Sequence, residues 1–176
     1  MNELELRNML YTATNTPTPY SIRYPRGCGE GVEWKGAEFE MVATGVGREL
    51  KSGNDLAILS IGTAGNFAAE AIAKVEQEGK HLIAHYDLRF AKPLDEKLIA
   101  QVAAKFDKVI TVEDGVLRGG VGEAVAKRLY ANGFKGEVRT LGIEDKFIEH
   151  GTPAELYSIC GYDAEGIART INQMLV

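Results

Sequence analysis

A glycine-rich stretch, residues 111–129, has the residue types and spacing of an anion-binding turn. It reads TVEDGVLRGGVGEAVAKRL, the pattern of a strand, a tight turn and the start of a helix. Backbone N–H groups at a helix start attract phosphate groups. The spacing Gly120-x-Gly122-x-x-Val125 is close to the dinucleotide-binding fingerprint, but its third position is valine and no suitable acidic residue follows. The stretch also lacks the Gly-Lys-Ser/Thr of a P-loop.

We therefore interpret this stretch as a structural corner. Glycines let a helix begin close against the preceding strand. Glu113 and Asp114 would then be polar anchors near the helix N-terminus, where negative charge is favourable.

Three arginines are candidates for binding a phosphate or carboxylate. Arg23 and Arg26 lie in SIRYPRG, and Arg89 lies in DLRFAKP. The guanidinium fork matches either anion with two hydrogen bonds, and Pro25 and Gly27 shape the backbone around Arg26. The alternative is that these arginines are ordinary solvated surface residues.

The histidines do not have the pattern of a metal site. His81 and His85 are four apart, but HLIAHYDL has strand character, which would place them about 13 Å apart. His150, in FIEHGTP, lies in an expected loop at the ligand edge of the sheet, and we interpret it as a surface or interface residue.

Composition excludes several classes of protein. The 176 residues are 45% hydrophobic and 26% charged, with a net charge of −5 and no basic block, which argues against a nucleic-acid surface. No apolar run reaches the roughly 18 residues of a membrane span. Cys28 and Cys160 are far apart and suggest neither a disulfide framework nor a thiolate metal site. We expect a soluble, cytoplasmic protein.

The first forty residues differ in pattern from the rest. Residues 2–14 form a plausible helix with Asn2 and Glu5 in capping-box spacing, and Tyr20 to Tyr24 a brief strand. Residues 28–40 have the composition of a polar, glycine-rich linker. Two strand candidates, residues 41–50 and 55–64, are then joined by KSGN, which predicts a hairpin with one antiparallel strand.

From there helices and strands alternate. The pattern predicts helices at 65–79 (closed by Gly79), 93–106, 119–133 and 163–175, and strands at 81–88, 108–114 and 136–143. Near-continuous apolar strands indicate a sheet covered on both faces. The predicted fold is α/β: a three-layer α/β/α arrangement with a mainly parallel, five-stranded mixed sheet and one antiparallel strand. Ligands of such sheets meet the carboxyl ends of the strands.

Taken together, the motifs RYPRG, YDLRFAKPLDE, TVEDG with GGVG, LGIEDKFIEHGTPAEL and GYDAEGIARTI resemble the 1-deoxy-D-xylulose-5-phosphate synthase family. The resemblance covers essentially the whole chain. Pyruvate dehydrogenase beta subunits and transketolases share the domain type. The resemblance implies a carboxy-terminal part: residues 1–27 from the end of the pyrimidine-binding domain, 28–40 a linker, and 41–176 a transketolase carboxy-terminal domain.

The resemblance also implies a chemistry. Enzymes of this family use thiamine diphosphate and Mg²⁺ to condense pyruvate with D-glyceraldehyde 3-phosphate. The products are carbon dioxide and 1-deoxy-D-xylulose 5-phosphate, which is a precursor of isoprenoids and thiamine. The catalytic glutamate and the metal motif belong to domains that precede this part. Arg26 matches the position that helps to hold the substrate phosphate, and Arg23 ranks second. We expect no catalytic, cofactor-binding or metal-binding residue here, and no cofactor bound to this chain alone.

Three readings of the function follow. In the first, the chain is inactive without the missing amino-terminal and pyrimidine-binding domains of a homodimeric enzyme, with no nucleic-acid or membrane partner. In the second, it is a separate carboxy-terminal subunit of a split transketolase-like or 2-oxoacid dehydrogenase enzyme. In the third, it is a non-catalytic ligand-binding or regulatory domain with the same fold.

Overall fold

The computed structural model describes residues 1–77, 79 and 81–176. The chain divides into two compact units, Met1–Thr44 and Gly45–Val176. Residue 78, which belongs to the predicted helix 65–79, lies outside the described residues. None of the described helices is long and apolar enough to cross a lipid bilayer.

The first unit contains the predicted amino-terminal helix. Helix α1 spans Glu3–Thr14, and the Asn2 side chain caps it by accepting a hydrogen bond from the Glu5 N–H at 3.0 Å. The predicted strand at Tyr20 to Tyr24 is wrong, since these residues are irregular. A strand needs a neighbour to pair with, and the described residues of this unit contain no strand that could be one.

The second unit contains a mixed sheet that confirms the predicted fold class. In the described residues the order is β1-β3-β2-β4-β5, with β1 antiparallel to β3 and the other neighbours parallel. The strands are β1 (Arg48–Lys51), β2 (Leu56–Ile61), β3 (Ile83–Asp87), β4 (Lys108–Val116) and β5 (Glu137–Ile143).

The predicted hairpin between the first two strands is wrong. Strand β1 pairs with β3, so that Arg48 lies opposite Asp87, and it begins at Arg48 rather than at residue 41. Burial explains the difference. Strand β2 is almost wholly apolar and buried, so it takes the centre of the sheet between β3 and β4, whereas the charged RELK segment suits an edge.

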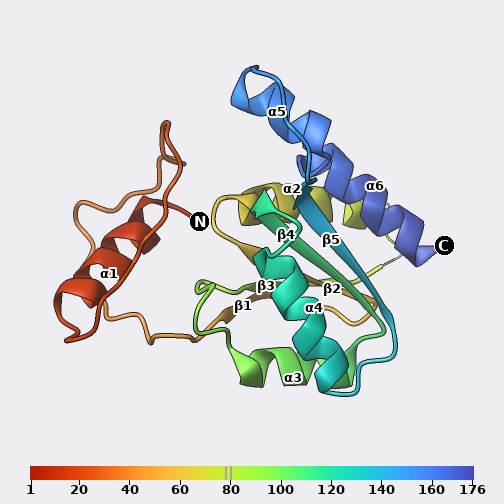
Figure 1. Ribbon diagram of the computed structural model, residues 1–176, viewed down its shortest axis with the longest axis horizontal. Helices are drawn as coiled ribbons and strands as arrows, with labels where there is room; N and C mark the ends of the chain where they lie inside the picture. Colours follow the sequence, from red (N-terminus) through yellow and green to blue (C-terminus); the bar gives the residue numbers. More distant parts are fainter. Residues whose placement is uncertain (78, 80) are drawn as a thin grey trace. The chain divides into compact units, whose positions relative to one another are not determined.

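Helices cover both faces of the sheet (Figure 1). Helices α2 (Ala64–Gln77) and α6 (Ala164–Leu175) lie on one face, and α3 (Glu96–Lys105) and α4 (Val121–Ala131) on the other. Each face has its own apolar cluster, with Ile58 and Ile110 in the first and Leu59 and Val109 in the second. Alternate residues of each central strand therefore enter opposite layers.

One helix escaped the sequence prediction. Helix α5 spans Pro153–Cys160 and begins with a complete capping box between Thr152 and Glu155, with proline in its first turn. This spacing of threonine, proline and glutamate is a readable helix-start signal. The helix leads into α6, whose cap is Asp163.

Candidate functional site

The glycine-rich corner after β4 is closed by a carboxylate of the chain itself. The Glu113 side chain is 5% exposed; its Oε2 accepts from the Val121 N–H at 3.0 Å and its Oε1 from the Gly122 N–H at 2.7 Å. These donors at the start of α4 are the groups that a bound phosphate would need. The predicted anchoring role of Glu113 is therefore confirmed, and a phosphate has no place at this helix start.

Close packing explains a glycine in this corner. A Cβ at Gly122 would lie 2.5 Å from the Thr111 Oγ1 on β4, which is closer than side-chain carbons approach other atoms. Val125, the third position of the near-fingerprint, is fully buried in the apolar cluster of this face. The predicted tight joint between strand and helix is thus confirmed.

Asp114 has a different partner from the predicted one. Its Oδ1 accepts a hydrogen bond from the Tyr162 hydroxyl at 2.8 Å, on the opposite face of the sheet from Glu113. Successive residues of a strand point to opposite faces, which is why the two acids cannot share one helix start. Burial, and then the Asp114 carboxylate, raises the pKa of Tyr162. Asp114 therefore links β4 by a hydrogen bond to the turn between α5 and α6.

Asp87, at the carboxyl end of β3, also forms hydrogen bonds within the second unit. Asp87 is 1% exposed and accepts from the Arg48 guanidinium at 3.0 and 3.2 Å. Its second oxygen accepts from the Arg89 N–H at 3.0 Å, and Arg89 has a left-handed backbone with a φ of 58°. Asp87 thereby holds both the edge strand and the turn that carries Arg89. An anion-binding role for Arg89 stays a prediction.

The histidines at 81 and 85 have separate environments. His85 is 2% exposed, and its Nε2 lies 2.8 Å from the Ser60 Oγ. The His81 Nδ1 lies 3.8 Å from the Asp55 carboxylate, before β3 begins. Burial lowers the pKa of His85 to about 4, partly opposed by the nearby Asp87. His85 is therefore a neutral core residue at neutral pH.

The lowered pKa of His85 predicts that the folded protein is less stable in acid than at neutral pH. Its pKa is lower in the folded chain than the ordinary value of 6.5, so below about pH 6.5 the unfolded chain binds a proton that the folded chain does not. We expect the free energy of unfolding to fall by about 2 kcal/mol from this group between pH 7 and 4.5. Urea unfolding of the parent and His85→Gln at both pH values measures it. An equal loss in the two proteins would contradict this assignment.

His150 is exposed, as predicted for a surface residue. It lines an open surface pocket of about 430 Å³ together with Gly151, Glu155, Ser158 and Ile159. Glu155 is already engaged in the capping box of α5. The pocket therefore extends along α5, from the residues before its cap to Ser158 and Ile159 in its last turn.

Two of the three candidate anion-binding arginines lie in the first unit. Arg23 and Arg26 are exposed in the irregular segment after α1, and Gly27 beside Arg26 has a φ of 151°. Arg89 belongs to the second unit. The structure thus presents Arg26 on a surface, where its role stays a prediction.

The part of the chain that the structure describes contains no group of three or more His, Cys, Asp or Glu that could hold a metal ion. Cys28 is exposed and Cys160 half-buried, and both are free thiols. The buried Asp87 and Glu113 and the half-buried Asp114 bind arginine N–H groups, backbone N–H groups and the tyrosine hydroxyl, respectively. They therefore do not fit a Mg²⁺–diphosphate group.

Residues 45–167 match the family model of the transketolase carboxy-terminal domain. The chain is similar to the 1-deoxy-D-xylulose-5-phosphate synthase of Bacteroides fragilis, with 47% identity over 98% of this chain and 27% of that protein. The synthase of Cytophaga hutchinsonii is 48% identical over 99% of this chain, again with 27% of that protein. The chain thus spans about a quarter of the length of these curated relatives. The resemblance inferred from the motifs is confirmed.

Solved structures agree with the fold. A split-gene transketolase, described as an inactive β4 tetramer, has a TM-score of 0.70 and 29% identity over 77% of this chain and 44% of that chain. The transketolase of Campylobacter jejuni has a TM-score of 0.53 at 18% identity over 72% of this chain and 18% of that chain, which bears on the fold alone.

Proposed function

Because the chain belongs to the transketolase carboxy-terminal domain family, we propose that it is the carboxy-terminal part of a 1-deoxy-D-xylulose-5-phosphate synthase. The complete enzyme would condense pyruvate and D-glyceraldehyde 3-phosphate, with loss of carbon dioxide, using thiamine diphosphate and Mg²⁺. The observation that carries this proposal is the 47% identity with such a synthase over 98% of the chain. This match extends through the first unit, beyond the residues of the family model.

The chemistry would belong to domains other than this one. Glu113 occupies the N–H groups at the start of α4, and Asp87 is paired with Arg48. The described residues contain no group of side chains that could hold a metal ion, so the residues that bind Mg²⁺ and the cofactor would lie in the other domains. The proposed domain boundary after residue 40 is supported by the division of the chain at Thr44.

The chain's own contribution to the reaction would be to bind the aldehyde substrate. Arg26 is exposed, and its planar guanidinium can donate two hydrogen bonds to a phosphate. Arg23, three residues earlier, would add positive charge to the same segment. Such contacts orient the aldehyde by its phosphate and leave bond formation to the rest of the enzyme.

The proposal predicts that the isolated chain has no catalytic activity. With pyruvate, D-glyceraldehyde 3-phosphate, thiamine diphosphate and Mg²⁺ supplied, we expect no product above background, because the residues that activate the cofactor would be absent. Coupling the same chain to the missing domains should restore turnover, measured as carbon dioxide release and as 1-deoxy-D-xylulose 5-phosphate by mass spectrometry. Turnover by the chain alone would refute the proposal.

A split enzyme is the second candidate, and one observation favours it. The solved structure with a TM-score of 0.70 is a split-gene transketolase described as an inactive β4 tetramer. If this chain were a similar subunit, it would become active on mixing with a separate partner chain. The mass of the protein isolated from its natural source distinguishes the two: about 19.2 kDa for a separate subunit, and roughly four times that mass for a single polypeptide, given 27% coverage.

A further inference from the structure

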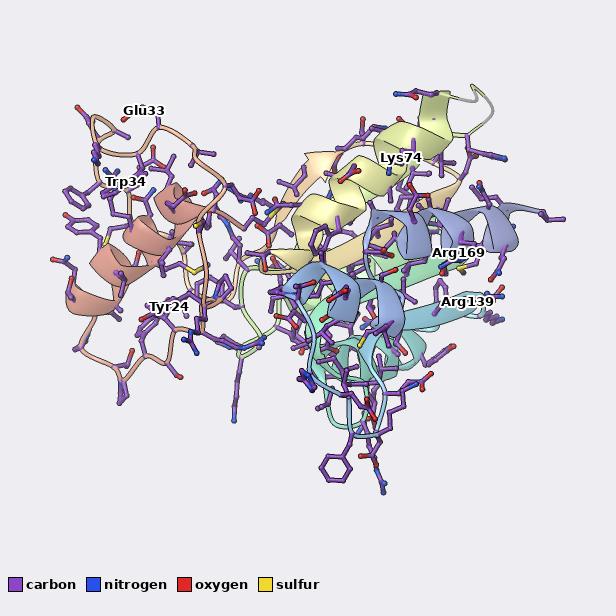
Figure 2. All side chains as sticks on the ribbon, turned by 90° about the horizontal axis from the view of Figure 1, so that it is seen from above. Tyr24, Glu33, Trp34, Lys74, Arg139 and Arg169 are labelled. Carbon is purple, nitrogen blue, oxygen red and sulfur yellow. The ribbon has the colours of Figure 1, made fainter. Side chains whose placement is uncertain are left out.

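Residues 29–42, which include most of the predicted linker at 28–40, contact one face of α1. The buried side chains of this helix are polar: Glu5, Asn8 and Thr12. Apolar side chains of the helix, such as Leu10 with 48% exposure, are more exposed to solvent than these polar ones. Figure 2 shows the irregular segments that carry Tyr24 and Trp34 running alongside α1. The helix thus uses its polar face to hold its own following segment.

The far end of this segment is held through backbone groups. The Arg7 guanidinium donates to the Ala37 carbonyl at 3.0 Å and also to the carbonyls of Trp34 and Glu38. The guanidinium carbon lies 4.4 Å from the centre of the Phe39 ring. Five residues further along α1, the Thr12 Oγ1 accepts from the Val42 N–H at 2.8 Å. These contacts give residues 34–42 a defined path along the helix.

The near end of the segment is held by Glu3. Its Oε1 accepts from the Gly31 N–H at 2.7 Å. Backbone N–H groups, its own first and then that of Gly31, lower the pKa of the Glu3 carboxyl. A Cβ at Gly29 would lie 2.1 Å from the same Oε1, so a larger residue there would have to displace the Glu3 carboxylate from this position. Glycine at position 29 therefore leaves room for the Glu3 carboxylate beside the loop.

Arg26 lies between two hydrogen-bonded points of the first unit, the Tyr20–Thr44 contact and the Glu3–Gly31 contact. On its amino-terminal side, the Tyr20 hydroxyl bonds the Thr44 hydroxyl. On its carboxy-terminal side, the Glu3–Gly31 bond holds the chain five residues later. A segment fixed at both ends loses fewer conformations when its side chain binds a ligand. Releasing one end would make Arg26 bind its anion less well without removing the arginine.

We propose that Glu3 is a positioning residue for Arg26: by binding the Gly29–Gly31 loop it holds the guanidinium where the phosphate of the substrate aldehyde binds. This inference rests on the proposed function, which supplies the phosphate. Glu3 itself would not touch the substrate. Its contribution would appear in the affinity for the phosphorylated aldehyde and not in the affinity for pyruvate.

The first measurement uses the 176-residue chain and amide hydrogen exchange. Glu3→Ala should speed exchange in the peptide containing Gly31 by about tenfold, because its N–H loses a charge-assisted acceptor. Glu3→Gln keeps an acceptor oxygen and should give a smaller change. Glu30→Gln, which neutralises an exposed carboxylate in the same loop, is the matched control and should leave exchange unchanged. Unchanged exchange in Glu3→Ala would overturn the proposal.

The second measurement uses steady-state kinetics of the complete enzyme. Glu3→Ala should raise the KM for D-glyceraldehyde 3-phosphate by about three- to tenfold, while kcat and the KM for pyruvate stay the same. In an Arg26→Ala background the same change should have no further effect, because there is then no guanidinium to position. A merely structural role would lower kcat in both backgrounds.

The outcomes separate the two proposals. If Arg26→Ala raises the aldehyde KM but Glu3→Ala does not, or if the two effects multiply, Glu3 is not a positioning residue and the phosphate assignment stands. If Arg26→Ala alone leaves the KM unchanged, the phosphate assignment fails, and the role of Glu3 fails with it. Because Glu3→Ala removes a fold contact, Glu3→Gln is assayed beside it, and a variant that unfolds is recognised by its circular dichroism.

Discussion

Replacing Glu113 by alanine is expected to lower the free energy of unfolding by about 3 to 5 kcal/mol, because two charge-assisted hydrogen bonds are lost together. The carboxylate binds the N–H groups of Val121 and Gly122 at the start of α4. The Gly122 site is buried, so water cannot easily replace the lost acceptor. The negative charge also interacts favourably with the helix dipole. Urea unfolding followed by far-ultraviolet circular dichroism at pH 7 measures the change.

Glu123 provides a matched control in the same turn. Its Oε2 accepts from the Gly119 N–H at 2.6 Å, but this contact is exposed. Glu123→Ala should therefore cost about 1 kcal/mol or less. Glu113→Gln should be intermediate, since the amide oxygen can accept one bond while its NH₂ group faces the other donor. Equal losses for Glu113→Ala and Glu123→Ala would show that burial of the first carboxylate contributes nothing.

Replacing Arg26 by alanine in the complete enzyme is expected to raise the KM for D-glyceraldehyde 3-phosphate by about tenfold to a hundredfold. A charge-assisted bond to a desolvated phosphate contributes about 1.5 to 3 kcal/mol. The effect should fall on the phosphorylated aldehyde, while the KM for pyruvate stays unchanged. Initial rates at varied concentrations of each substrate, with the other saturating, give the two constants.

Two controls make this result specific. Unphosphorylated D-glyceraldehyde should be used equally poorly by the parent enzyme and by Arg26→Ala, because it lacks the group that Arg26 would bind. Arg118→Ala removes another exposed arginine, which is 81% exposed and paired with Asp145, and it should leave both KM values unchanged. An unchanged aldehyde KM in Arg26→Ala would show that this guanidinium does not contact the substrate.

Local sequence patterns were sufficient to predict most helices and strands of the second unit. Strands β2, β3 and β4 are short apolar runs, and the intervening helices carry their own start signals, such as Asp95 before α3. The glycine-rich corner was also readable, because a near-fingerprint with valine at its third position argues for packing. Helix α5 was missed although its capping box was present in the sequence.

Contacts between segments that are distant in the sequence could not be predicted from local sequence patterns. KSGN has the composition of a hairpin turn, yet β1 passes β2 and pairs with β3. The choice depends on which strand can be buried on both edges, a property of the whole sheet and not of the turn. The Asp114–Tyr162 bond is similar, since 48 residues separate its partners.

Residue types at short spacing were enough to identify the family, the fold class, the succession of helices and strands along the second unit apart from α5, and the lack of a complete phosphate-binding fingerprint. Which distant groups contact each other was visible only in the folded structure. It placed the Glu113 carboxylate where an anion would bind, and it showed that Glu3 holds a loop 28 residues away. Hydrogen bonds of this kind depend on angles and distances between backbone groups, and those exist only once the chain has folded.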